Sequence, residues 1–151
     1  MTGPARDRIL AALAEATVPG ELAPLALGWA TVDLDRAVDE LARELGLPAA
    51  AFLPEADSIA LGARCRAADG VLPGGVSLAI LEPATEGSLA AALARHGEGP
   101  SVTWARSAGA PGRRSAPLRP GPFGPERLQP GAPPQGPFVL LIGDGPGTIH
   151  T

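Results

Sequence analysis

The chain has 151 residues, of which 45% are apolar, and this length is enough for one domain with a single buried core. Its net charge of −4 argues against a general surface for nucleic acid or for an anionic membrane. The single cysteine, Cys65, excludes an internal disulfide and a cysteine-built metal site, and it favours a reducing cytoplasm as the location.

Residues 1–20 are predicted to form an N-terminal helix that precedes a single domain over residues 21–151. Pro4 suits the first turn of a helix, and Pro19 with Gly20 suits the chain beyond its end. The stretch is too short and too charged for a signal peptide or a membrane span. We expect it to pack outside the core through three apolar residues, Ile9, Leu10 and Leu13.

Residues 25–83 are predicted to form a β-α-β-β-β module. Its helix is expected over 33–45, because apolar residues recur there on one face, Asp33 can cap its start and Gly46 can end it. The strands are expected over four short ranges, the second of them weak: 25–32, 50–53, 59–67 and 75–82.

The stretch ILEPATEGSLAAALARHGEGP, residues 80–100, predicts a strand end, a second helix over 85–96 and a Gly-Glu-Gly-Pro corner. Thr85 is the expected N-cap of this helix. His96 lies in its last turn, where a partly cationic imidazole suits the helix dipole, so we favour a structural role for it over a catalytic one. A strand over 101–106 should follow the corner.

The chain then repeats part of its pattern. The tetrapeptide over 27–30 aligns with the one over 102–105, and each has tryptophan as its third residue. If the two stretches are equivalent strands, side-chain alternation places both tryptophans, Trp29 and Trp104, on the same face of the sheet. We therefore expect both of them to pack beneath helices.

The second module, over about 101–142, is expected to lack its helix. The segment 107–136 is so rich in proline and glycine that no useful helix fits, and we expect it to lie against the sheet as a loop. Five arginines against one glutamate over 106–127 either bind an anion or are simply solvated. A last strand is expected over 137–142.

Two such modules, with VDLDRAVDEL after the first strand and LAILEPATEGSLAAALARHGEGP at the junction, resemble the vicinal oxygen chelate superfamily of glyoxalase-like and bleomycin-resistance-like proteins. Within it, the junction is most similar to methylmalonyl-CoA epimerases. The resemblance implies an α+β fold in which paired βαβββ modules build a curved mixed β-sheet, here with the second module shortened and without its helix. It also implies a lyase or isomerase chemistry, in which His, Glu or Gln, His and Glu inside a half-open barrel hold a divalent metal that stabilises an enolate-like intermediate.

The residues at the four implied ligand positions do not suit a metal. Those positions fall on Ala26, Ala79, Ser101 and Leu140. Alanine and leucine have no donor atom, and a neutral serine hydroxyl is a poor ligand on its own. The only histidines of the chain are His96 and His150, and they cannot restore the set. The sequence therefore predicts a degenerate member of the superfamily with no metal and no cofactor.

We expect such a protein to bind a small organic molecule in the concavity of its sheet, as the drug-binding members of the superfamily do. The expected ligand-binding residues are small or hydroxylic side chains on the inner face and two arginines of the loop: Ala26, Gly28, Ser77, Ala79, Ser101, Thr103, Arg113 and Arg114. The competing expectation is that larger neighbours fill this space.

Two other functions stay open on the sequence. One is a lyase or isomerase of the glyoxalase or epimerase type that works through an unconventional acid such as Glu55 or Glu98. The other is a scaffold for protein contacts. A homodimer is also expected, because a module without its helix leaves the outer face of its sheet uncovered, around Phe138, Leu140 and Ile142 or the residues between them. The N-terminal helix is the competing cover for that face.

Overall fold

The computed structural model describes residues 4–17, 22–84, 86–107, 118–128 and 138–142. The elements follow the chain in this order: α1 (Pro4–Thr17), β1 (Leu22–Ala30), α2 (Leu34–Leu45), η1 (Ala49–Ala51), β2 (Leu53–Ser58), β3 (Ala63–Leu72), η2 (Pro73–Gly75), β4 (Val76–Pro83), α3 (Ser88–His96), β5 (Gly99–Ser107), β6 (Glu126–Leu128) and β7 (Phe138–Ile142). Among the described residues, no helix is both long and apolar enough to cross a bilayer.

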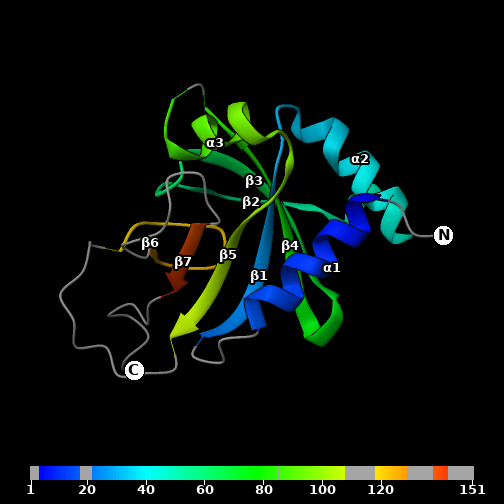
Figure 1. Ribbon diagram of the computed structural model, residues 1–151, viewed down its shortest axis with the longest axis horizontal. Helices are drawn as coiled ribbons and strands as arrows, with labels where there is room; N and C mark the ends of the chain where they lie inside the picture. Colours follow the sequence, from blue (N-terminus) through cyan, green and yellow to red (C-terminus); the bar gives the residue numbers. More distant parts are fainter. Residues whose placement is uncertain (1–3, 18–21, 85, 108–117, 129–137, 143–151) are drawn as a thin grey trace.

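The strands form one mixed sheet of seven strands in the order β2-β3-β4-β1-β5-β7-β6, and the sheet is strongly curved (Figure 1). β1 pairs in parallel with β4, and β5 pairs in parallel with β7, whereas the remaining pairs are antiparallel. In each module, β1 to β4 and β5 to β7, the first strand therefore lies beside the last. The antiparallel β1–β5 pair joins the two modules. This arrangement confirms the predicted fold class.

Helix α2 forms where its sequence predicts it. The side chain of Asp33 accepts a hydrogen bond from the backbone N–H of Arg36, which caps the start of the helix. Gly46 follows the last turn with a left-handed φ of 71°, and this conformation is least costly for glycine. The buried side chains lie on the predicted face: Leu34, Ala37, Val38, Leu41 and Ala42.

Some boundaries differ from the prediction because tertiary contacts override local pattern. β3 begins at Ala63 rather than at 59, since Ile59 to Gly62 form a turn in which Gly62 has a φ of 65°. α3 begins at Ser88, and Gly87, with a φ of 120°, stands at its N-cap position. The predicted cap, Thr85, lies outside the described residues.

The loop predicted over 107–136 is not free of regular structure. Glu126–Leu128 forms β6 and pairs antiparallel with β7, so the expectation that this segment has no element of its own is wrong. The residues that precede β6 fold back on it, because Arg119 and Glu126 exchange backbone hydrogen bonds of 2.7 and 2.8 Å. Phe123 and Leu128 pack against the sheet, as predicted for this segment.

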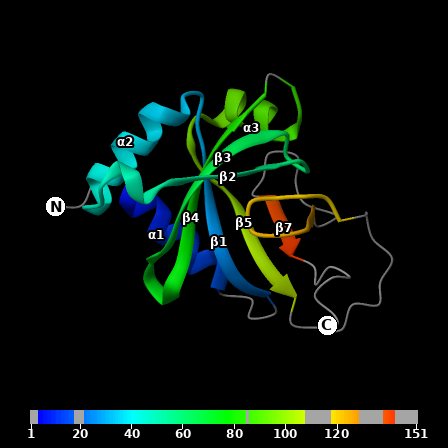
Figure 2. The same ribbon diagram turned by 180° about the vertical axis from the view of Figure 1, so that it is seen from behind.

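The two faces of the sheet have different covers. The helix-side cluster joins Leu27 and Trp29 of β1 to buried residues of α1 and α2, such as Ile9 and Val38. α1 and α2 lie next to each other on this side in both views (Figure 1, Figure 2). The opposite, concave face carries a second buried group, called here the concave cluster: Ala26, Ala30, Leu61, Ala63, Cys65, Ala67, Ala79, Leu81, Leu89, Ala92, Val102, Trp104, Phe138 and Leu140.

Helix α1 covers β1 and β5 on the helix side, where the second module has no helix in its described residues. Ile9 is fully buried there, and the Arg8 guanidinium lies 5.2 Å from the centre of the Trp29 ring. The backbone N–H of Arg6 also donates to Glu44 of α2 at 3.0 Å. The N-terminal helix therefore covers the helix side of β1 and β5, the two strands that join the modules.

Candidate functional site

The concave face has a floor of small residues. Ala26, Gly28 and Ala30 come from β1, and Ala79 comes from the adjacent strand β4. A Cβ at Gly28 would lie 2.8 Å from Cζ3 of Trp104, so only glycine leaves enough room for the indole ring at this point. Trp104 is 0% exposed. The indole of Trp104 therefore covers the small floor. This agrees with the competing expectation from the sequence, in which larger neighbours fill the space.

Trp104 occupies the place where the resemblance implies a metal. Ala26 pairs with Trp104 across β1 and β5, and Trp104 pairs with Leu140 across β5 and β7. The indole thus lies between two of the implied ligand positions. Ala26 and Leu140 have no donor atom, and the Ser101 hydroxyl donates to the backbone oxygen of Gly99 at 3.1 Å. These residues do not fit a metal ion.

The prediction that both tryptophans pack beneath helices is correct for Trp29 and wrong for Trp104. Trp104 pairs with Ala26 across β1 and β5, and paired residues share a face of the sheet, so Trp104 lies on the concave face. Trp29 alternates with Ala30 and lies on the other face. The two tetrapeptides are therefore not equivalent places in the sheet.

A buried carboxyl group faces Trp104. Glu126 of β6 is 0% exposed, and its Oε1 accepts a hydrogen bond of 2.9 Å from the indole Nε1–H of Trp104. Its Oε2 accepts a hydrogen bond of 2.6 Å from the hydroxyl of Ser58, a residue that is also 0% exposed. Burial raises the pKa of Glu126, although the hydrogen bonds from Ser58, Trp104 and the backbone of Ala60 oppose this shift. Sequence reasoning missed this group, and the available signal was a tryptophan N–H that needs an acceptor when buried.

The same contacts close the mouth of the concavity. β2 and β6 are the two ends of the strand order, and Ser58 and Glu126 join them. Beside this contact, the N–H of Ile59 donates to the oxygen of Pro120 at 3.2 Å. The ring of Phe123 lies 5.0 Å from that of Trp104 with an edge-on angle of 67°. Residues 118–128, called here the strap, therefore lie across the concave face.

The structure gathers only some of the predicted ligand-binding residues. Ala26, Gly28 and Ala79 lie on the concave face, and Ser77 pairs with Ala26 on the same face, where its Oγ accepts from the N–H of Gly70 at 3.1 Å. Thr103 pairs with Leu27, which belongs to the helix-side cluster. The placement of Thr103 on the inner face is therefore wrong, because Thr103 alternates with Trp104, which pairs with Ala26 on the concave face. Arg113 and Arg114 lie outside the described residues.

Glu98 of the Gly-Glu-Gly corner stabilises the fold through hydrogen bonds. Oε2 of Glu98 accepts hydrogen bonds from Thr31 Oγ1 at 2.9 Å, Val32 N at 3.0 Å and Arg36 Nη2 at 2.6 Å. Burial acts to raise the pKa of Glu98, but these hydrogen bonds outweigh it and the pKa is lowered. The corner thereby ties the start of β5 to the β1–α2 connection, and the contacts of Glu98 do not leave it free for catalysis.

Two other polar groups border the concave face. Glu55 on the edge strand β2 is half-buried and pairs with Cys65, whose side chain belongs to the concave cluster. Burial, reinforced by the nearby acids Glu55, Glu126 and Asp57, raises the pKa of Cys65 to about 12, so this thiol stays protonated and weakly reactive. Among the described residues, no group of three or more His, Cys, Asp and Glu side chains is arranged to hold a metal ion.

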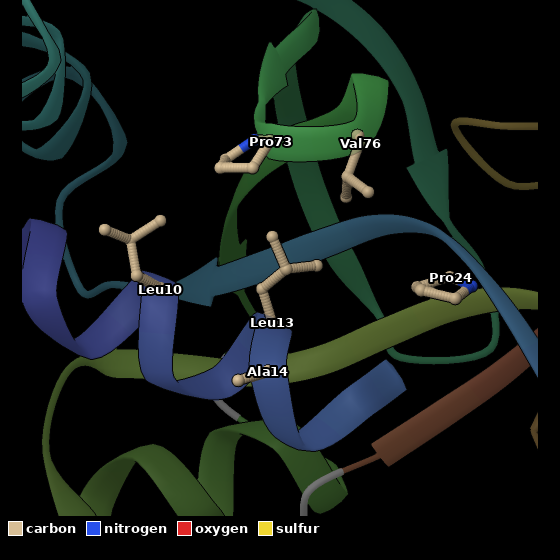
Figure 3. A pocket seen from close by; sticks show the side chains of 7 residues that line it. Leu10, Leu13, Ala14, Pro24, Pro73 and Val76 are labelled. Carbon is tan, nitrogen blue, oxygen red and sulfur yellow. The ribbon is translucent and has the colours of Figure 1, made fainter. Parts of the chain in front are cut away.

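A groove of about 530 Å³ lies on the other side of the sheet, between α1 and the turn that precedes β4 (Figure 3). Leu10 and Leu13 of α1 point toward Pro73 and Val76 across it. The side chains that line it are apolar, so it offers shape but no polar side chain to orient a ligand.

Solved structures share this fold. No protein-family model matches the sequence, and no curated protein matches it significantly. Methylmalonyl-CoA epimerase from Mycobacterium tuberculosis aligns with a TM-score of 0.57 and 18% identity over 81% of this chain and 86% of that one. A variant of the Streptomyces coelicolor epimerase in complex with 2-nitronate-propionyl-CoA aligns with a TM-score of 0.56 and 19% identity over 80% of this chain and 98% of that one. A methylmalonyl-CoA epimerase in complex with methylmalonyl-CoA and NH4+ aligns with a TM-score of 0.55 and 20% identity over 80% and 95%. The chain therefore has the fold of the vicinal oxygen chelate superfamily, in the form that methylmalonyl-CoA epimerases have.

Proposed function

We propose that the protein binds a small organic molecule in the concavity of its sheet, and that it does so without a metal ion. The observation that carries this proposal is the fully buried carboxyl group of Glu126 on the concave face, with Ser58 and Trp104 as its partners. Burying a carboxyl group is costly, and an apolar side chain would fill the same space at lower cost. A polar group in the concavity of this fold is better explained by ligand recognition than by packing.

We infer the ligand class from the fold and from the arginines of the sequence over 106–127. Two of the three solved structures described above hold acyl-CoA compounds, which carry carbonyl oxygens and negative charge. Ala26, Gly28 and Ala79 would provide the small floor, with Ser77 and Ser101 toward its ends. Arg113 and Arg114 of the basic loop would bind the anionic part of the ligand. We therefore favour an anionic molecule that bears a carbonyl group.

A calorimetric titration tests this function. The protein is dialysed against a chelator and titrated with methylmalonyl-CoA, benzoate and propionate. We expect at least one of them to bind with the metal removed. Replacing Arg113 and Arg114 together with alanine should weaken that binding about tenfold, the loss of roughly one charge-assisted hydrogen bond.

The control for this titration is Arg95→Ala, since Arg95 is an exposed arginine at the end of α3. This variant should bind as the unmodified protein does. Binding that appears only after a divalent metal is added back would reject the metal-free site. Equal affinity in the double arginine variant would instead remove the loop from the site.

A lyase or isomerase of the epimerase type is the second candidate. The observation that favours it is the raised pKa of Glu126, caused by burial, because an acid with such a pKa is suited to taking up and returning a proton nearer neutral pH. In this case Glu126 would act as the unconventional acid in place of Glu55 or Glu98. Turnover of a bound compound that disappears in Glu126→Gln, while binding persists, would favour this candidate over a binding protein.

We also propose a homodimer, formed through the outer face of β7. Val139 and Leu141 lie half-buried at the positions that alternate with the inward-facing Phe138 and Leu140. An apolar strand face of this kind is often buried by a partner. Light scattering should give about twice the chain mass of 15.1 kDa, whereas a value equal to one chain would mean that α1 provides sufficient cover within the monomer.

A further inference from the structure

The partners of Glu126 share one chemical property, because all of them are hydrogen-bond donors. The hydroxyl of Ser58 donates at 2.6 Å and the indole N–H of Trp104 donates at 2.9 Å, each to a different oxygen of the same carboxyl group. The backbone N–H of Ala60 also stabilises the charged form of this carboxyl group. Ser58 and Trp104 are both 0% exposed, so solvent water does not reach them. Glu126 is therefore the acceptor that satisfies these buried donors.

We infer that Ser58 and Trp104 form a binding site for a carboxylate, and that Glu126 of the strap occupies this site as an internal stand-in for the ligand. The inference rests on the proposed function, and it names the group of the ligand that the concavity recognises. A free carboxylate would replace Glu126 and make the same two hydrogen bonds. The strap would have to move away from the concave face for this exchange to occur.

The position of the donors supports this assignment. They come from two separate parts of the fold, namely the end of β2 with the turn after it and the middle of β5, and they converge on one point of the concave face. That point lies over the small floor, since Trp104 contacts Gly28 and pairs with Ala26. A ligand with its carboxylate at the donors would therefore have room for its remaining atoms only where the strap now lies.

The strap is attached more weakly than the strands around it. β6 pairs with β7 over three residues, whereas β4 pairs with β1 over five and with β3 over seven. On its other edge, the strap is held to the β2 end by hydrogen bonds from Ser58, Ile59 and Ala60. Segments with few buried contacts open at lower free energy than the core of a domain. Opening of the strap can therefore occur while β1, β4 and β5 stay folded.

Removing the internal carboxylate provides the test. In Glu126→Ala the donors lose their acceptor, and sodium acetate should supply a new one. We expect acetate at ten times its Kd to raise the Tm of this variant by about 3 °C, relative to sodium chloride at the same ionic strength. The indole N–H signal of Trp104 should shift in the proton–nitrogen NMR spectrum, while that of Trp29, on the helix side, should not.

Two matched proteins serve as controls. The unmodified protein keeps its own carboxyl group in the site, so acetate should change its Tm no more than chloride does. The double variant Glu126→Ala, Ser58→Ala lacks one donor and should lose most of the response. An equal response of all three proteins to acetate would overturn the inference.

A second variant covers the case in which Glu126→Ala does not fold. Glu126→Ser removes the carboxylate but keeps a small polar side chain at this position, and acetate is again the probe. The same Tm rise and the same shift of the Trp104 signal are expected, and their absence in a folded Glu126→Ser protein would contradict the carboxylate site.

The acetate experiment and the calorimetric test of the proposed function can succeed or fail independently. If acetate binds Glu126→Ala but no organic compound binds the unmodified protein, the donor site stands and the proposed function fails. If the unmodified protein binds a compound but acetate does not act on the Glu126 variants, the proposed function stands and the carboxylate assignment fails.

Discussion

Replacing Trp104 with alanine is expected to lower the free energy of unfolding by about 3–5 kcal/mol, the usual cost of truncating a large buried aromatic side chain. The indole is 0% exposed, contacts the Gly28 position and lies edge-on to Phe123. Its loss would also remove one of the hydrogen bonds of Glu126. Urea denaturation at neutral pH measures the effect.

Trp104→Phe is the matched control for this experiment. Phenylalanine keeps an aromatic ring in the concavity but has no N–H to donate to Glu126. The expected loss is about 1–3 kcal/mol, which reflects mainly the unpaired carboxyl oxygen. If Trp104→Ala were as stable as the unmodified protein, the indole would not be the side chain that fills the concave face.

The second large effect concerns Glu126. Glu126→Ala leaves the buried donors of Ser58 and Trp104 without an acceptor, and this should lower the free energy of unfolding by roughly 2–4 kcal/mol. Glu126→Gln retains an oxygen for the indole N–H and an N–H₂ group that can donate to the Ser58 oxygen. We expect this variant to lie within about 1 kcal/mol of the unmodified protein.

The pH dependence of Glu126→Gln has a definite sign. Burial raises the pKa of Glu126 in the folded state, so the folded protein holds the proton at a pH where the unfolded chain has released it. The stability that this proton contributes is fully present below the unfolded pKa and is lost as the pH rises through the raised pKa. Glutamine does not titrate, so the stability of Glu126→Gln relative to the unmodified protein should increase over that interval. Urea titrations at several pH values measure it, and a relative stability that falls with rising pH would contradict the raised pKa.

The local pattern of the sequence predicts much of the fold. Asp33 and Gly46 mark the ends of α2, and the spacing of the apolar residues between them is sufficient to identify its buried face. The strands at β1, β4, β5 and β7 lie within a few residues of their predicted ranges. These features depend on residues close together in the chain, for which periodicity and capping are sufficient signals.

The candidate site could be predicted only in part, because its geometry depends on distant contacts. Ser58 and Glu126 are separated by 68 residues, and no local pattern indicates that they meet. Trp104 faces the concavity because it pairs with Ala26, and the repeat that aligns Trp104 with Trp29 does not indicate this pairing. The sequence correctly indicates small residues on the concave face, but it does not indicate which side chains cover them.

An NMR titration of the two indole N–H signals tests the central claim most directly, since the chain has only two tryptophans and they lie on opposite faces of the sheet. The unmodified protein is titrated with methylmalonyl-CoA or with whichever compound of the panel binds in calorimetry. Binding in the concavity should move the Trp104 signal and leave that of Trp29 in place. Saturating binding that leaves the Trp104 signal unchanged would contradict a ligand site on the concave face.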